Sequence, residues 1–274
     1  MAGLISGATG QAVGHPLDTL KVHAQAARSA NHLRFVSLWR GAAVPIATVG
    51  AIQSLALGIF ENVRRALWPH EAPTPLSRLA AAGTTCGVCV SVVTCPLSRV
   101  KILQMLTGVS FADAVRQCLA SRTLYRAYPT AAMWEATRGS YMVLYALLKN
   151  AFDPAARGGQ SNAGSGPPLP LWARLLAGGG ANVLNIAAWY PLNTVLHVQQ
   201  SELPPGLMQP SAPTQPRVAR GLLETGRTLH ASGGWVRLYR GFGYTMLRAG
   251  PVAAVVMPSF EIVLPWLERQ MWRL

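Results

Sequence analysis

The sequence predicts an all-α membrane protein with six transmembrane helices, arranged as three repeats of two helices joined by short helices. Composition is the first reason: of 274 residues 50% are hydrophobic and 12% are charged, and the mean hydropathy is +0.25. Such values are typical of membrane proteins rather than of soluble domains. About 20 apolar residues cross a bilayer, and six apolar segments of at least that length occur, at about 3–27, 43–67, 76–105, 128–150, 170–200 and 242–267.

A heptapeptide that occurs three times is the second reason. His-Pro-Leu-Asp-Thr-Leu-Lys at 15–21 returns, with substitutions, as Cys-Pro-Leu-Ser-Arg-Val-Lys at 95–101 and Tyr-Pro-Leu-Asn-Thr-Val-Leu at 190–196. Repetition on this scale indicates one structural unit used three times. The predicted organisation is repeat 1 at 1–72, repeat 2 at 73–156, a Gly/Ser/Pro linker at 157–168, and repeat 3 at 169–274 with a Pro-rich loop insertion at 203–216.

A second landmark follows each heptapeptide: an aromatic residue, an arginine and a small residue, at 39–41, 125–127 and 239–241. Two unrelated signatures therefore repeat in the same order. The pattern resembles that of the mitochondrial carrier family, and the resemblance spans almost the whole chain. It implies the mitochondrial carrier fold, in which each repeat holds a Pro-containing helix, a short helix on the matrix side and a second transmembrane helix.

The prolines of the heptapeptides, Pro16, Pro96 and Pro191, are expected inside the first, third and fifth helices. A proline inside a helix removes one backbone hydrogen bond and bends the axis. Three such bends would draw the helix ends toward a common axis and enclose a cavity that is open on one side. Small residues at helix-contact spacing, such as Gly83 and Gly87, would let neighbouring helices approach closely.

The formal net charge is +14 and the isoelectric point is near 10.7, which in a soluble protein would favour nucleic-acid binding. The lysines and arginines lie mostly between the apolar segments, so nucleic acid is not a predicted partner. Basic loops mark the side that is not translocated, and in the carrier family these loops face the matrix. We therefore expect a multi-pass protein of the mitochondrial inner membrane, without a cleavable presequence and with both termini on the intermembrane side.

The heptapeptides also predict a gate on the matrix side. By the family's rule, the residue two after each proline meets the residue five after the proline of another repeat. The predicted pairs are Asp18 with Lys101, Asn193 with Lys21, and Ser98 with Leu196. One pair is ionic, one is polar, and one has lost both charges together, so that no single charge is stranded in the low-dielectric interior. Gln25 and Gln200, nine residues after their prolines, would either brace these pairs or be solvated at the interface.

A second gate, on the intermembrane side, is predicted from an aromatic-acid-x-x-base pattern in the even-numbered helices. It begins at Phe60, Tyr145 and Phe260 and is incomplete in the last two copies. The same cyclic rule pairs Glu61 with Lys149 and Glu261 with Arg64. The alternative is that these are ordinary charges at helix ends.

The predicted substrate site combines positions that match the family's contact points, and its members are Arg248, Met133, Trp134, Glu135, Arg138, Thr48 and Gln53. The guanidinium of Arg248 can hold a carboxylate through its planar fork. Glu135 would meet an amino group and Trp134 would stack on a cation. The alternative for Glu135 and Arg138, three residues apart, is a local pair on one helix.

The aromatic-arginine-small tripeptides predict lipid binding, because helix N-termini attract phosphates. The resemblance implies cardiolipin at Arg40, Gly41, Arg126, Arg240 and Gly241.

No arrangement of nucleophile, base and acid, no phosphate-binding loop and no metal cluster is apparent in the sequence. Cys86 and Cys89, spaced as in a redox or zinc motif, lie in an apolar run and indicate packing. We predict neither an enzyme nor a cofactor, apart from structural cardiolipin. The predicted function is exchange of a small carboxylate or an amino-acid or carnitine-like metabolite by alternating access. The alternative is a carrier-fold protein that no longer transports and serves as a subunit or adaptor of an inner-membrane respiratory complex.

Overall fold

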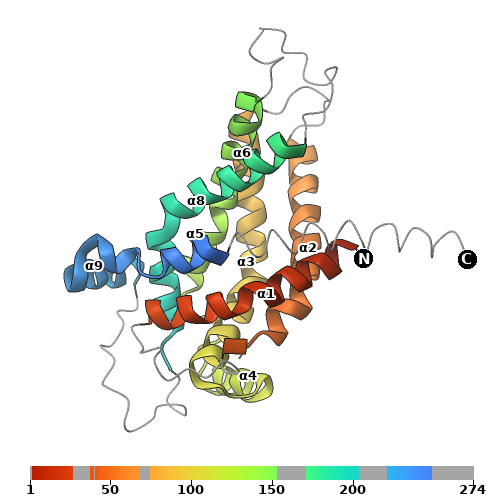
Figure 1. The fold of residues 1–274 in the computed structure, drawn as a ribbon. Coiled ribbons are helices and arrows are strands. Elements are labelled where there is room, and N and C mark those ends of the chain that lie inside the picture. Colours follow the sequence, from red (N-terminus) through yellow and green to blue (C-terminus); the bar gives the residue numbers. More distant parts are fainter. Residues whose placement is uncertain are drawn as a thin grey trace, which may run out of the picture. The chain divides into compact units, whose positions relative to one another are not determined.

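The computed structural model describes residues 2–26, 38–39, 41–67, 75–152, 171–203 and 221–248, and every regular element in these ranges is a helix (Figure 1). The predicted linker 157–168 and residues 204–216 of the predicted insertion lie outside the described residues. The same is true of Arg40 and Glu261, and of the side chains of Gln53 and Glu61.

Three long helices contain the prolines of the heptapeptides. They are α1 (Ala2–Gln25), α3 (Leu76–Thr107) and α8 (Leu171–Gln200), with Pro16, Pro96 and Pro191 in their interiors. Each proline stands nine residues before the end of its helix or a little more, so a full two turns of helix follow it. Those turns carry the remainder of the repeated heptapeptide, which is therefore helical in all three copies.

The remaining predicted apolar segments are helical wherever they are described. The second forms α2 (Ala43–Leu67), and the sixth is helical over 242–248, the part that falls within the described residues. The fourth forms two helices, α5 (Tyr128–Ala136) and α6 (Arg138–Phe152), where the sequence predicted one. At the break, the amide and hydroxyl of Thr137 both donate to the carbonyl of Trp134, at 3.1 and 2.7 Å. This local bonding replaces the regular helical pattern, as threonine side chains can do.

Two further helices follow Pro-containing ones: α4 (Phe111–Ala120) comes after α3, and α9 (Leu222–Leu238) comes after α8. Ser110 caps α4, since its hydroxyl accepts from the amide of Asp113 at 3.2 Å. The path of α9 is interrupted near its end at Gly233 and Gly234, and Gly234 takes a left-handed φ of +61°. These helices agree with the short helices that the sequence predicted in the second and third repeats.

Of the helices in the described ranges, α3 has by itself the length and apolar character of a membrane span, with a mean hydropathy of 1.6 over its most apolar stretch. Length and composition are the basis of this assignment.

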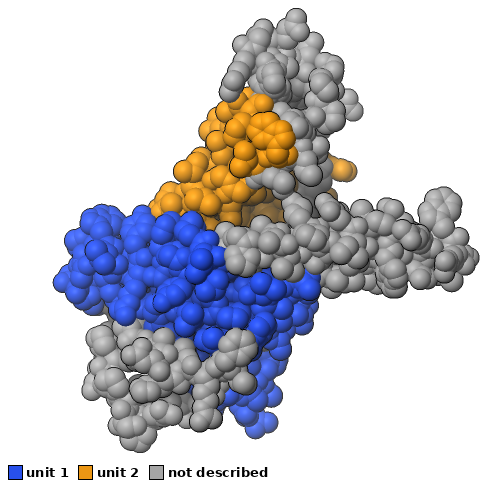
Figure 2. Space-filling model, viewed as in Figure 1, with its two compact units in different colours: residues 1–54, 92–131, 191–274 blue, residues 55–91, 132–190 orange. Residues whose placement is uncertain are grey.

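The chain divides into two compact units, coloured separately in Figure 2. Unit 1 comprises residues 1–54, 92–131 and 191–274, and unit 2 comprises residues 55–91 and 132–190. Unit 1 therefore contains all three heptapeptides except Tyr190, together with α4 and α9. Its buried apolar side chains form two clusters, whose members are Val22, Ile102, Met105 and Leu106 in one and Val195, Val198, Leu229 and Leu238 in the other.

In unit 2, small residues bring α3 against α5 and α6. A methyl group on Gly87 would overlap the carbonyl group of Glu135, and one on Gly83 would come within 2.8 Å of the Cα of Gly139. Thr84 donates to the carbonyl of Ala136 at 3.4 Å. The close helix approach predicted at Gly83 and Gly87 is thus present.

Gly87→Ala is expected to lower the stability of the protein by about 1–3 kcal/mol, because the added methyl meets backbone that no side-chain rotation can move. Thermal unfolding of the purified protein in detergent measures the effect. Gly179→Ala on α8 is the matched control, since no atom lies within 4 Å of its new methyl group. Equal melting temperatures for the two variants would contradict the contact.

The third residue of each aromatic-arginine-small tripeptide has the same unusual backbone. Gly41, Ala127 and Gly241 have φ values of +77°, +61° and +87°. Glycine adopts this left-handed conformation freely, whereas a residue with a Cβ is strained by about 1–2 kcal/mol. The three copies therefore turn the chain alike, and the second does so with a less suitable residue.

Ala127→Gly is expected to raise stability by up to about 1 kcal/mol, since relief of the strained φ exceeds the entropy that glycine adds to the unfolded chain. Gly41→Ala should act in the opposite direction, because its methyl would also lie 3.1 Å from the carbonyl oxygen of Lys101. Melting temperatures of both variants test this, and a loss of stability in Ala127→Gly would count against it.

Candidate functional site

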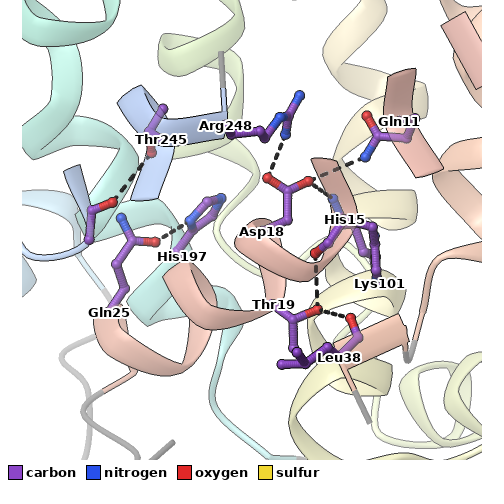
Figure 3. Close-up of polar contacts among 11 residues, drawn as sticks. Gln11, His15, Asp18, Thr19, Gln25, Leu38, Lys101, His197, Thr245 and Arg248 are labelled. Carbon is purple, nitrogen blue, oxygen red and sulfur yellow. Dashed lines mark hydrogen bonds and ion pairs between the residues drawn. The ribbon is translucent and has the colours of Figure 1, made fainter. Parts of the chain in front are cut away.

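A carboxylate shared by two cations lies within unit 1 (Figure 3). Asp18 follows Pro16 on α1, and its side chain is 12% exposed. Its Oδ2 accepts from Lys101 Nζ at 3.0 Å and from Gln11 Nε2 at 3.2 Å, while its Oδ1 accepts from Arg248 Nη1 at 2.5 Å. Each oxygen therefore holds one cation, which makes this a network rather than a simple pair.

The repeated heptapeptide explains how Asp18 and Lys101 meet. The acid stands two residues after the proline of α1, and the base stands five residues after the proline of α3, one turn further along. The ion pair joins the two residues that the cyclic rule pairs. Whether the pair acts as a gate remains a prediction.

Arg248 has a partner that the sequence interpretation did not assign to it. We expected it to hold substrate, and the structure pairs it with Asp18. The interpretation assigned Arg248 from its match to the family's contact points, and such a match carries no information about α1. The arginine side chain remains 33% exposed, so that it is accessible to a solute as well.

The residues nine beyond each proline connect the three Pro-containing helices in a cycle. Gln25 on α1 donates to Thr194 on α8 at 3.2 Å. Gln200 on α8 accepts from Ser98 on α3 at 3.0 Å. The carbonyl of Met105 on α3 accepts from His23 Nε2 on α1 at 3.1 Å. Both glutamines are fully buried, so their contacts fit a brace rather than solvation at the interface.

One predicted pair is not formed. Asn193 Oδ1 is buried and has no hydrogen-bond partner in the described part of the chain, so it does not accept from Lys21. Ser98 donates to Gln200, since leucine at 196 offers no polar group, and the opposition of Ser98 and Leu196 stays a prediction.

The sequence interpretation also missed Arg99, which stands three residues after Pro96. The other two repeats have threonine there, and Thr19 and Thr194 donate to the carbonyls of Leu38 and Leu238, both at 2.7 Å. Arg99 is fully buried and instead donates to two carbonyls at the end of α8. These belong to Gln200 and to Glu202, the second at 2.6 Å. The signal in the sequence was an arginine in a position that is threonine in both other copies.

Of the residues predicted to bind lipid, Arg126 forms an ion pair with Glu202. It therefore belongs to the same link between α3 and the end of α8 as Arg99, and its role at a lipid phosphate stays a prediction. Arg240 is exposed after α9, beside Gly241, and Gly41 precedes α2. These positions leave the lipid interpretation of the first and third tripeptides as a prediction.

In unit 2, Glu135 and Arg138 form the local pair that was the alternative to substrate binding, with Arg138 Nε 2.8 Å from Glu135 Oε2. A second set of polar contacts, which the sequence did not reveal, is centred on Ser140, two residues after Arg138. Ser140 donates to Asn185 at 2.6 Å, and Trp189 Nε1 donates to Ser140 at 3.1 Å. These contacts join α6 to α8.

The other predicted substrate contacts lie on the expected helices. Met133 and Trp134 are on α5, and the side chain of Met133 is exposed. Thr48 and the backbone of Gln53 are on α2. Of the predicted intermembrane gate, Arg64 lies on α2 and Lys149 on α6, while their predicted acidic partners are not described. That gate remains a prediction.

Within the described residues no group of three or more His, Cys, Asp or Glu side chains could hold a metal ion. Cys86 and Cys89 are not joined in a disulfide, and Cys86 donates to the carbonyl of Ala56 at 3.0 Å. Cys86 is buried, in agreement with a packing role, whereas Cys89 is exposed.

Proline-containing apolar helices that surround a charge network are typical of membrane transport proteins. Comparison with known proteins agrees: the sequence model of the mitochondrial carrier protein family matches residues 167–271. The mitochondrial glycine transporter YMC1 of Saccharomyces cerevisiae is 25% identical, with 96% of this chain and 89% of that protein aligned. The mitochondrial basic amino acids transporter of Rattus norvegicus is 27% identical, with 97% and 89% aligned. The mitochondrial carnitine/acylcarnitine carrier protein of Homo sapiens is 27% identical, with 93% and 89% aligned.

The last part of the chain thus matches the mitochondrial carrier protein model, and nearly the whole chain is distantly similar to amino-acid and carnitine carriers of mitochondria. This similarity agrees with the family that the motifs indicated. The names of these relatives describe transporters and carriers, in agreement with the prediction that the chain is not an enzyme.

Proposed function

We propose that this protein is a carrier of the mitochondrial inner membrane that moves a small carboxylate of amino-acid or carnitine type by alternating access. The observation that carries the proposal is the charge network of Asp18, Lys101 and Arg248 among apolar helices. Charges within such helices are costly unless they serve a pathway or a switch. The proposal includes three repeats, six spans and termini on the intermembrane side, supported by the helical heptapeptides and the cycle of contacts nine residues beyond the prolines.

The substrate class follows from the chemistry of Arg248. A guanidinium binds carboxylates through paired donors. The names of the relatives mention glycine, basic amino acids and carnitine. Each of these solutes combines a carboxylate with a cationic nitrogen. Trp134 and the carboxylate of Glu135 would accept that nitrogen.

In this proposal the matrix side closes through Asp18 and Lys101, with Gln25 and Gln200 as braces. The intermembrane side closes through Glu61 with Lys149 and Glu261 with Arg64. Each pair would be worth about 1 kcal/mol in a wet cavity, an amount that substrate binding can offset. Cardiolipin would bind at Arg40 with Gly41 and at Arg240 with Gly241, where helix N-termini and arginines favour phosphate.

The test is exchange by the purified protein in cardiolipin-containing liposomes, with radiolabelled glycine, arginine and carnitine inside and outside. We expect exchange of at least one of these, and Arg248→Ala should abolish it. Arg248→Lys should retain only a small fraction of the rate, because an ammonium lacks the planar fork. No exchange of any labelled amino acid or carboxylate across a broad panel would refute transport.

One observation favours a second candidate, a carrier-fold subunit that does not transport. The network on the matrix side is incomplete, since Asn193 Oδ1 has no partner in the described chain and Leu196 cannot form an ion pair. A subunit of an inner-membrane respiratory complex would not need to open and close. Stable co-migration with such a complex on native gels, together with absent exchange, would favour this candidate.

A further inference from the structure

We propose that Asp18 is a built-in competitor of the substrate: Arg248 exchanges the carboxylate of Asp18 for the carboxylate of the transported solute, which releases α1 from one of its two cations. The inference rests on the proposed function and adds to it how the substrate is recognised and how recognition is connected to the gate. It concerns the residues drawn at the centre of Figure 3.

The geometry assigns the two oxygens of Asp18 to different cations. Oδ1 lies 2.5 Å from Arg248 Nη1, and Oδ2 lies 3.0 Å from Lys101 Nζ. Loss of the Arg248 contact therefore leaves the Lys101 contact in place. The side chain of Arg248 is 33% exposed and that of Asp18 is 12% exposed. A solute can therefore reach the arginine before the contact between Arg248 and Asp18 is broken.

The donor arrangement of arginine makes the two carboxylates compete. An end-on pair of hydrogen bonds to a carboxylate uses both Nη1 and Nη2. Asp18 accepts from Nη1. A solute bound end-on would share this nitrogen with Asp18, and repulsion between two carboxylates on one guanidinium favours displacement of Asp18.

The local charge defines the solute. Asp18 contacts two cations, and Lys21 stands one turn further along α1. An added carboxylate brings this region closer to neutrality, whereas an added cation does not. The preferred solutes therefore carry one free carboxylate, and amides or esters of the same compounds should bind far less tightly.

After the exchange, Asp18 is held by Lys101 and Gln11. The matrix-side network is weaker by one charge-assisted hydrogen bond, which is among the stronger contacts in a protein. Binding of a carboxylate to Arg248 thus weakens the network directly, because Arg248 is itself a member of the network.

Two variants separate this exchange from simple weakening of the gate. Asp18→Asn keeps the shape of the side chain but frees Arg248 from a carboxylate, so glycine, arginine and carnitine should bind at least tenfold more tightly. Lys101→Gln weakens the same network but leaves Asp18 on Arg248, so affinity should stay the same or fall. Affinities are read from the rise in melting temperature of the full-length protein in detergent with cardiolipin, titrated with each compound. Glycinamide and argininamide serve as controls and should not gain affinity in either variant.

A double-mutant cycle with Asp18→Asn and Arg248→Gln, measured as melting temperature, reports the pair itself, and additive effects would overturn the inference. If Asp18→Asn does not fold, Asp18→Ser takes its place. Equal gains for acids and amides, equal gains in Lys101→Gln, or no gain at all would each overturn the inference. Carboxylate binding with this pattern but without exchange in liposomes would support the inference and refute transport alone.

Discussion

Asp18→Ala is expected to abolish solute exchange and to lower the melting temperature, the largest effect of any single substitution in the charge network. Lys101 and Arg248 would lose the carboxylate that both contact, with the ammonium of Lys21 one turn away on α1. Removing one member of a partly buried ion group leaves like charges close together, which commonly costs about 3 kcal/mol. Exchange assays in liposomes and thermal unfolding measure the two consequences separately.

A charge swap provides the sharper form of this experiment. If Asp18 and Lys101 were an isolated pair, Asp18→Lys combined with Lys101→Asp would restore stability and exchange. In the structure the swap places an ammonium beside Arg248, so we expect the double variant to remain inactive and unstable. Full recovery in the swap would mean that Arg248 is not a partner of Asp18.

The second large effect is expected for Arg99→Thr, which introduces the residue that the other two repeats have in this position. The change removes the donors to the carbonyls of Gln200 and Glu202 at the end of α8. Because each buried carbonyl left without a donor costs about 1–3 kcal/mol, we expect a loss of about 3 kcal/mol or more in total.

Arg116→Thr on α4 is the matched control for Arg99→Thr, because Arg116 is exposed and its replacement should change stability by less than about 0.5 kcal/mol. Thermal unfolding of both variants is the measurement. Similar melting temperatures for the two would show that the buried arginine does not stabilise the end of α8.

Features that depend on local sequence could be predicted well. The positions of α1, α2, α3 and α8 follow from apolar length, and the places of the prolines inside them follow from the heptapeptide. The break at Thr137 could not be predicted, because it depends on whether a hydroxyl bonds to a carbonyl on its own helix, and most threonines in helices do not interrupt them.

Polar contacts between helices were predicted only where the repeat itself supplied a rule. The rule paired Asp18 with Lys101. It made no prediction for Arg248 or Arg99, because the other repeats have no arginine in the corresponding positions. Packing decides such contacts, and packing depends on side-chain lengths across an interface. The sequence nevertheless shows that Arg99 departs from the threonine of the other two repeats. This departure coincides with the hydrogen bonds from Arg99 to the end of α8.

The arginines at the end of α8 give the three Pro-containing helices unequal attachments. Arg99 and Arg126 fasten the α8 terminus, through Gln200 and Glu202, to the α3 side of unit 1. By contrast, one of the contacts that hold α1 at Asp18 is the ion pair with Arg248, which in the proposed exchange a solute displaces. In a carrier that opens toward the matrix, the first side would behave as a hinge and the second as a latch. Labels or inhibitors that detect the onset of opening are therefore best directed at α1.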